Sequence, residues 1–177
     1  MRGAVKLKRL GSPIYIGIDA ASKLMPIVAF VPGEETPRVG LYKLDDRAGA
    51  RACGVAIRSV SHFIGTLPID ISTRLNLQVF IEQPVMYGGG RGAKAVYLQS
   101  FTSGAIQGAF AIHGASVSLV APSRWKKVVV GRGNADKRFV ASAVRRRWPD
   151  HYRLVAGSQD LIDAYCIARY SRSPVTS

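Results

Sequence analysis

The segment Ser158–Ala168 carries two acidic residues inside an otherwise apolar pattern. Asp160 and Asp163 are three residues apart, so a helix presents both carboxylates on one face. Like charges repel and an apolar helix is largely buried, so the pair would be costly without a cation to neutralise it. The competing interpretation is a helix start at Gly157-Ser158, with an acidic residue stabilised by the helix dipole.

Two further acidic residues close apolar runs elsewhere in the chain. The run Ile14–Asp19 is rich in β-branched residues and predicts a buried strand with Asp19 at its carboxyl end. The run Leu77–Glu82 repeats this pattern, and Pro84 then directs the chain out of the sheet. Ligands of open α/β sheets bind at the carboxyl ends of strands, so both positions favour function over packing. If the two strands are neighbours, the two carboxylates meet.

Four carboxylates that converge in one site require divalent cations. Hard oxygen donors select Mg²⁺, with Mn²⁺ as a substitute, over Zn²⁺. Two such ions about 4 Å apart can activate a water and stabilise the leaving oxygen of a phosphodiester. The pattern therefore predicts that the four acidic residues bind metal and act in catalysis: Asp19, Glu82, Asp160 and Asp163.

The remaining patterns predict the elements that must hold these acidic residues. Strands are expected over 25–31, 38–44 and 116–120, helices over 47–66 and 93–113, and a helical turn from Pro122 to Trp125. Glycine and alanine in segment 93–113 allow close helix approach, which favours core packing and leaves a dimer contact open. With 177 residues and 47% hydrophobic content, the chain suits one domain over 14–172, after a disordered basic arm over 1–13.

The charge balance predicts a polyanionic partner. Lys and Arg total 25 against 11 Asp and Glu, a net charge of +14, which is typical of nucleic-acid binding. Segment 124–153 holds ten of the basic residues and two acidic ones, which favours a phosphate-contacting surface over a merely solvated face. Arg91, in the glycine-rich stretch 88–92, is another candidate phosphate contact. The basic segment supplies the candidates Lys126, Lys127, Arg132 and Lys137.

Cysteine usage and hydropathy bear on the compartment. Cys53 and Cys166 lack metal-ligand spacing, which indicates a reducing environment inside the cell. No stretch reads as a membrane span. We therefore expect an intracellular, DNA-associated protein, in the cytoplasm or nucleoid if the source is bacterial or viral, with an organelle as an open alternative.

Four segments together resemble the signatures of RuvC-type Holliday junction resolvases, in the same order over residues 14–170. They are Gly17-Ile-Asp19, Ile81-Glu82-Gln83, Val129–Lys137 and Asp160–Ala164. The resemblance implies a ribonuclease H-like α/β fold with a mixed five-stranded sheet, order 3-2-1-4-5, flanked by helices. It also implies a homodimer and metal-dependent symmetric incision of four-way DNA junctions. It assigns metal binding and catalysis to the four acidic residues, and DNA contact to Lys126 and Lys137.

The sequence departs from this family at the position where some members place an aromatic wedge. Val85 stands there, so Tyr87 is the remaining candidate for opening a junction. The glycine-rich stretch 88–92 also departs. The alternatives are therefore a nuclease for broader branched DNA or RNA–DNA hybrids, and a DNA-binding module without catalysis. An actin-like phosphotransferase needs a second lobe, for which 177 residues leave no room.

Overall fold

The computed structural model describes residues 12–20, 23–44, 50–68, 76–85 and 93–174. The expected N-terminal arm, apart from Ser12 and Pro13, lies outside these residues. Within them, no helix is long and apolar enough to cross a membrane. Cys53 and Cys166 are both free cysteines.

A five-stranded mixed sheet forms the centre of the molecule. Its strands are β1 (Ile14–Ile18), β2 (Leu24–Phe30), β3 (Arg38–Lys43), β4 (Leu77–Glu82) and β5 (Ser116–Val120). The order is β3-β2-β1-β4-β5. The first three strands pair antiparallel, whereas β4 runs parallel to both β1 and β5. The predicted sheet, its order and the adjacency of the first and fourth strands are confirmed.

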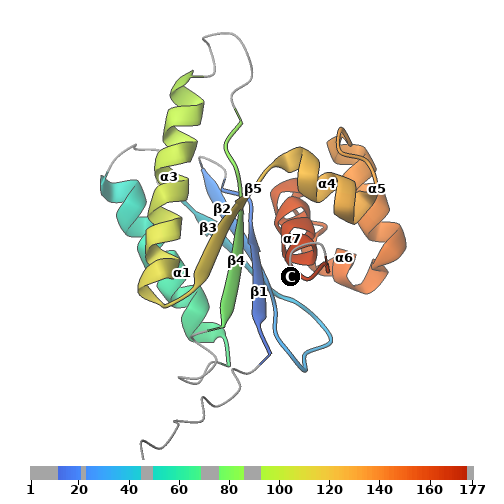
Figure 1. Ribbon diagram of the computed structural model, residues 1–177, viewed down its shortest axis with the longest axis horizontal. Coiled ribbons are helices and arrows are strands. Elements are labelled where there is room, and N and C mark those ends of the chain that lie inside the picture. Colours follow the sequence, from blue (N-terminus) through green and yellow to red (C-terminus); the bar gives the residue numbers. More distant parts are fainter. Residues whose placement is uncertain (1–11, 21–22, 45–49, 69–75, 86–92, 175–177) are drawn as a thin grey trace, which may run out of the picture.

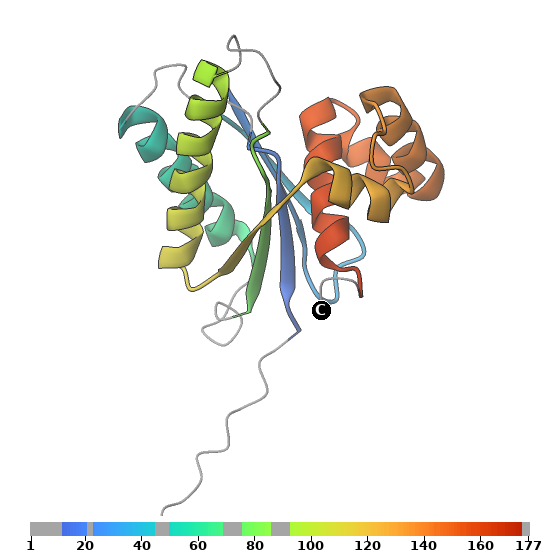
Figure 2. The ribbon, with the colours of Figure 1, turned by 45° about the horizontal axis from the view of Figure 1, so that its top comes forward.

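Helices cover both faces of this sheet. On one face lie α1 (Ala50–Thr66) and α3 (Ala93–Ile112) (Figure 1). On the other lie α4 (Pro122–Val130), α5 (Lys137–Arg147), α6 (Pro149–Val155) and α7 (Gln159–Ser171), as the turned view in Figure 2 also shows. The molecule is therefore a three-layer α/β/α structure.

The side chains of β1 alternate between the two faces of the sheet and pack into both helical layers. Ile14, Ile16 and Ile18 are fully buried and belong to the core shared with α1 and α3. Tyr15 packs against the other core, shared with α4–α7, and Gly17 lies directly under α7. The next residue on this second face is the position that follows the strand. Strand alternation therefore directs the acidic residue at the end of β1 toward α7.

The segment after β5 forms a longer helix than the sequence predicts. Instead of a turn that stops at Trp125, α4 continues to Val130. The cause is a buried stripe formed by Trp125, Val129 and Val130, which keeps the helix packed on the core. Gly131 then ends the helix in the left-handed conformation, at φ 88°.

Candidate active site at the carboxyl edge of the sheet

Asp19 and Glu82 are neighbours because the strands that lead to them, β1 and β4, are paired. β1 and β4 run parallel with Ile18 paired to Ile81, so the residues that follow each pair stand side by side at the carboxyl edge. Asp19 is only 8% exposed, and Glu82 is half-buried. The fold thus places two carboxylates together where open α/β sheets bind their ligands.

A glycine brings the other two acidic residues to the same edge. A Cβ atom added to Gly17 would lie 2.1 Å from the backbone nitrogen of Ala168 and 2.3 Å from the carbonyl oxygen of Ala164. Helix α7 therefore rests backbone-on-backbone against β1, an approach that only glycine permits. Its first turns carry Asp160 and Asp163 past the end of β1.

The two interpretations of the acidic pair in α7 are compatible. Ser158 holds the N-cap position in an extended conformation, although its side chain makes no capping hydrogen bond. Asp160 lies in the first turn, where the helix dipole stabilises a carboxylate. Asp163 accepts a hydrogen bond from Gln159 Nε2 at 3.0 Å. The helix start is therefore as the sequence indicates, and both carboxylates also belong to the group at the sheet edge.

The electrostatics of Asp19 show that the four acidic residues share one environment. Burial raises the pKa of Asp19 most, and the carboxylates of Glu82, Asp163 and Asp160 add to the rise. Together, against an opposing effect of Lys137, they bring the pKa from 3.8 to about 8. A carboxyl group whose pKa is raised by burial and by three neighbouring carboxylates is typical of a functional site rather than of a solvated surface.

Glu82 is oriented by a residue that the sequence analysis did not assign. Burial raises the pKa of Glu82, and the indole of Trp125 opposes the rise by donating a hydrogen bond from Nε1 to Oε2 at 2.8 Å. Trp125 is fully buried in α4. The bond therefore ties the carboxylate of β4 to the core of the helical layer, which fixes its position.

Two predicted basic residues also face the carboxylates. Lys126 in α4 and Lys137 at the start of α5 each lower the pKa of both Glu82 and Asp163, which burial raises first. The ammonium of Lys126 lies 5.4 Å from the centre of the Trp125 ring. Positive charge thus stands beside the acidic residues, where a phosphate must approach.

The other predicted DNA contacts are distributed differently. Lys127 and Arg132 are exposed, and Arg132 Nε donates to Asn134 Oδ1 at 2.8 Å. Both remain candidates for phosphate contact on the surface near α4. Tyr87 and Arg91 lie outside the described residues, so their predicted roles stay predictions.

Three residues that position the site were not identified from the sequence. Gln159 lies four residues before Asp163, and this helical spacing is a signal that could have been read. Trp125 was recognised only as part of a helical turn, because its partner Glu82 is 43 residues away. Gly17 sits in the Gly-Ile-Asp string, but only the packed helix reveals why a side chain is excluded there.

Whether the candidate site suits a divalent cation depends on the atoms that would bind it. Among the described residues, no three His, Cys, Asp or Glu side chains stand ready-made around a metal position. The donors are nevertheless hard carboxylate oxygens, the kind that Mg²⁺ and Mn²⁺ prefer. A cation between them would offset the repulsion and the desolvation that raise the pKa of Asp19. The chemistry of the residues therefore suits such an ion.

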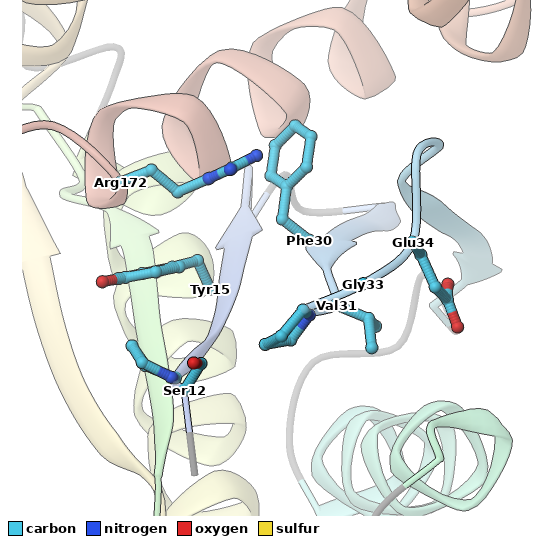
Figure 3. A pocket seen from close by; sticks show the side chains of 9 residues that line it. Ser12, Tyr15, Phe30, Val31, Gly33, Glu34 and Arg172 are labelled. Carbon is cyan, nitrogen blue, oxygen red and sulfur yellow. The ribbon is translucent and has the colours of Figure 1, made fainter.

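A cavity of ≈ 330 Å³ lies at the opposite edge of the sheet and has a different character (Figure 3). It is lined in part by Tyr15, Phe30 and Arg172, near the start of β1 and the end of β2. The guanidinium of Arg172 lies 4.7 Å from the centre of the Phe30 ring, and the carboxylate of Glu34 turns away to pair with Arg38 at 2.6 Å. Its charged groups are thus engaged with neighbours, away from the four acidic residues.

Comparison with known proteins identifies the fold. The chain is similar to Thermus thermophilus RuvC in complex with a Holliday junction substrate, with a TM-score of 0.65, 20% identity, and 93% of this chain and 95% of that chain covered. It is similar to another Thermus thermophilus RuvC structure with a TM-score of 0.62, 21% identity, and 90% and 93% covered. No protein-family model and no curated protein matches the sequence. The fold is ribonuclease H-like, as the resemblance implied.

Proposed function

We propose that this protein is a metal-dependent, structure-selective endonuclease that resolves four-way DNA junctions by paired symmetric incisions. The observation that carries the proposal is the carboxyl edge of the sheet. Asp19, Glu82, Asp160 and Asp163 gather there in one electrostatic group, and Lys126 and Lys137 stand beside them. The net charge of +14 and the likeness to a RuvC structure bound to a Holliday junction support DNA as the substrate.

Each residue of the site has a chemical role in this proposal. The four carboxylates would hold Mg²⁺, or Mn²⁺ in its place. When bound, such ions supply an activated water and stabilise the leaving oxygen of the phosphodiester. Trp125 and Gln159 hold the oxygens of Glu82 and Asp163 in place through hydrogen bonds of 2.8 and 3.0 Å.

The lysines act on the substrate. Lys126 and Lys137 draw the scissile phosphate toward the acidic residues, because their charge offsets the repulsion between phosphate and carboxylates. The exposed Lys127 and Arg132 bind the flanking backbone of the same strand.

A homodimer completes the proposal. Symmetric incision requires two sites related by a two-fold axis, and one chain carries one set of acidic residues. Helix α3 offers an interface, because Tyr97 and Ile112 are 68% and 79% exposed on a face with Phe101, Gly104 and Gly108. Nothing lies within 4 Å of a Cβ added at either glycine, so a second copy of the helix can approach closely there.

The test is cleavage of a matched set of substrates in Mg²⁺. A four-way junction, a three-way branch, a linear duplex and an RNA–DNA hybrid share one labelled strand and are compared on one gel. We expect paired, ligatable cuts in the four-way junction only. Equal cutting of the three-way branch would indicate a broader branched-DNA nuclease, and preference for the hybrid would indicate a ribonuclease H activity.

Variants separate catalysis from binding in the same assay. Asp19→Asn should abolish cleavage while junction binding stays nearly unchanged, because the substitution removes one donor and reduces repulsion with phosphates. The exposed turn acid Glu35, replaced by Gln, is the control and should cut normally. Full activity of Asp19→Asn would contradict the site, and binding without any metal-dependent cleavage by the unmodified protein would indicate a DNA-binding module.

A further inference from the structure

A cavity of ≈ 370 Å³, which we call the arginine cavity, lies at the C-terminal ends of α4, α5 and α7. Its lining comprises Val128, Val129, Arg147, Trp148, Arg169, Arg172 and Ser173. The volume is within the range of small-ligand pockets, about 300–1,000 Å³. Helix α7 carries Asp160 and Asp163 in its first turns and reaches the cavity at its other end. The arginine cavity is therefore separate from the candidate active site.

Arg169 is fixed by the aromatic rings behind it. Its Nε donates to the hydroxyl of Tyr165 at 2.9 Å, and one Nη lies 3.3 Å from Nδ1 of His151. Its guanidinium carbon lies 4.6 Å from the centre of the Trp148 ring and 4.8 Å from that of Phe30. Ring contacts use the face of a guanidinium, so the remaining N–H groups on its edge are left to meet a ligand.

The other two guanidiniums stand at the walls of the same cavity. Arg172, just past the end of α7, extends toward Phe30, with its guanidinium carbon 4.7 Å from the ring centre (Figure 3). Arg147, at the end of α5, donates from Nη1 to the backbone carbonyl of Val129, which also lines the cavity. Both keep further donors, because a guanidinium carries five N–H groups. Three positioned guanidiniums thus share one cavity.

Arginines at the C-terminal ends of helices also offset the helix dipole. That role requires only a place in the last turn, which Arg145 and Arg146 occupy without lining the cavity. Each helix end supplies only about half a negative charge, so the three full positive charges remain in excess. The described lining holds no acidic residue, and none of its arginines forms an ion pair with a described residue. An anion between these like charges would therefore be stabilised.

The charge and the donors of the arginine cavity favour a phosphate monoester. Such a group carries about −1.5 to −2 charges at pH 7 and offers three acceptor oxygens, which suits several guanidiniums. A carboxylate or a backbone phosphodiester carries a single charge. Val128 and Trp148 supply apolar surface for the group attached to the phosphate. The lining has no Asn or Gln side chain, so it offers no side-chain amide to read the edge of a base.

We propose that the arginine cavity binds the terminal phosphate of a phosphate monoester, supplied by a free nucleotide or by the 5′-phosphorylated end of a nucleic-acid strand. The site does not depend on the proposed nuclease function. A phosphate held by Arg147, Arg169 and Arg172 joins the C-terminal ends of α5 and α7. Because α7 also carries Asp160 and Asp163, the ligand stabilises the helix on which the candidate active site depends.

The first experiment titrates adenosine monophosphate into the protein by calorimetry. EDTA is present, so that no metal ion links the nucleotide to the acidic residues. Adenosine and uridine monophosphates should bind alike. Cyclic adenosine monophosphate, a phosphodiester of the same nucleoside, should bind at least about tenfold more weakly, and adenosine should not bind. Arg172→Gln should weaken binding of adenosine monophosphate by about tenfold or more, the value of one hydrogen bond to a charged group.

Matched variants locate the ligand. Arg145→Gln removes a charge from the same end of α5 outside the cavity, and Lys126→Gln removes one beside the candidate active site. Both should bind adenosine monophosphate as the unmodified protein does. Val128→Glu places an acidic side chain in the lining and should abolish binding, whereas Leu154→Glu, at an exposed apolar position of α6, should not. This second pair keeps the test decisive if Arg172→Gln does not fold.

Three results would overturn the proposal. Equal losses for Arg172→Gln and Arg145→Gln would indicate general attraction to a basic protein. A loss in Lys126→Gln with none in Arg172→Gln would place the nucleotide at the carboxyl edge of the sheet. Equal affinities for adenosine monophosphate and its cyclic phosphodiester would show that the arginines do not select a terminal phosphate.

The second experiment identifies the source of the phosphate. A short single strand with a 5′-phosphate is compared with the same strand ending in a 5′-hydroxyl, by fluorescence anisotropy in EDTA. If strand ends bind, the phosphorylated strand should bind about tenfold more tightly, and Arg172→Gln and Val128→Glu should remove this difference while Arg145→Gln keeps it. Equal affinities for the two strands, with adenosine monophosphate bound, would identify a free nucleotide as the source. Equal affinities without nucleotide binding would overturn the proposal.

Discussion

At the scale of single residues, the carboxyl group of Asp19 has the most strongly raised pKa of the candidate site. Burial and the three neighbouring carboxylates raise its pKa to about 8, above the ordinary value of 3.8. Between these two values, the folded state binds a proton that the unfolded chain has released. The free energy of unfolding therefore falls as pH rises through this window, and above about pH 8 the loss is complete.

The first prediction uses the substitution Asp19→Asn to test this fall in stability with rising pH. Asparagine cannot ionise, so the metal-free variant should be more stable than the unmodified protein at pH 9, by about 1.4 kcal/mol for each pKa unit of the shift that is relieved. The gain should shrink as pH falls toward 4. Chemical denaturation in EDTA at several pH values measures it, and adding Mg²⁺ should stabilise only the unmodified protein.

Asp150 provides the matched control. It is exposed and pairs with Arg153 at 3.3 Å, so Asp150→Asn should change stability little at any pH. A gain for Asp19→Asn that does not depend on pH would show that the carboxyl group is ordinary in the folded state.

The second prediction distinguishes two adjacent lysines. Lys126 lowers the pKa of Glu82 and of Asp163, so Lys126→Ala should raise both pKa values. The rising limb of the cleavage rate against pH should then move to higher pH. Lys127→Ala should leave the pH profile in place and reduce the slope of log affinity against log salt by about 0.9, the value for one lost phosphate contact. Identical pH profiles for the two variants would contradict the placement of Lys126.

At the scale of secondary-structure elements, the site depends on one contact between a strand and a helix. Gly17 allows α7 to lie on β1 with backbone atoms in contact, and this contact sets how far Asp160 and Asp163 reach beyond the strand. The other strand of the site, β4, is fixed by hydrogen-bonded register with β1. The helix therefore has less freedom to adjust than a helix packed through side chains.

The third prediction follows from that contact. A methyl group at position 17 must displace backbone atoms of Ala164 and Ala168, so Gly17→Ala should destabilise the fold by about 1–3 kcal/mol or more. The cleavage rate should fall further than the loss of folded protein explains, because α7 carries two of the four acidic residues of the candidate site. Gly65→Ala, in α1 with nothing within 4 Å of the new methyl group, should leave stability equal or higher by about 0.5–1 kcal/mol. Thermal unfolding and initial cleavage rates, measured for both variants, test these expectations.

These elements also show what the sequence could and could not predict. Short apolar runs that end in an acidic residue identified β1 and β4, because a buried strand with a polar end has a local signature. The predicted end of α4 was too early, since its last five residues, 126–130, are held in the helix by packing of Val129 and Val130 on a core that is distant in sequence. The bond from Trp125 to Glu82 and the approach at Gly17 are long-range contacts with no local signature.

At the scale of the whole molecule, the basic segment and the exposed apolar face of α3 lie on opposite sides of the sheet. The basic segment 124–153 belongs to the helical layer of α4–α6, whereas the exposed apolar face of α3 belongs to the opposite layer (Figure 1). Such a face is typical of a protein–protein contact. Two copies joined through α3 would leave both basic layers open to DNA.

The fourth prediction concerns this assembly. Free protein at micromolar concentration should sediment at about twice the monomer mass of 19.1 kDa. Ile112→Arg and Gly108→Arg should shift it to monomer and convert paired cuts into single nicks, because each places a charge on the α3 face. Leu154→Arg, at an exposed apolar position of α6, should sediment as the unmodified protein does. A protein that is monomeric both free and on the junction, yet still makes paired cuts, would contradict the interface.

The contact between β1 and α7 also bears on how the chain folds during its synthesis. The strand that precedes Asp19 is synthesised before the helix that carries Asp160 and Asp163, because β1 is the first and α7 the last of the described elements in chain order. Domains generally fold as units. A nascent chain that lacks α7 therefore holds only two of the four acidic residues of the candidate site. The central strand β1 also lacks the helix that packs on it. On the proposed function, the polypeptide would therefore lack a complete set of acidic residues for cleavage until α7 has docked.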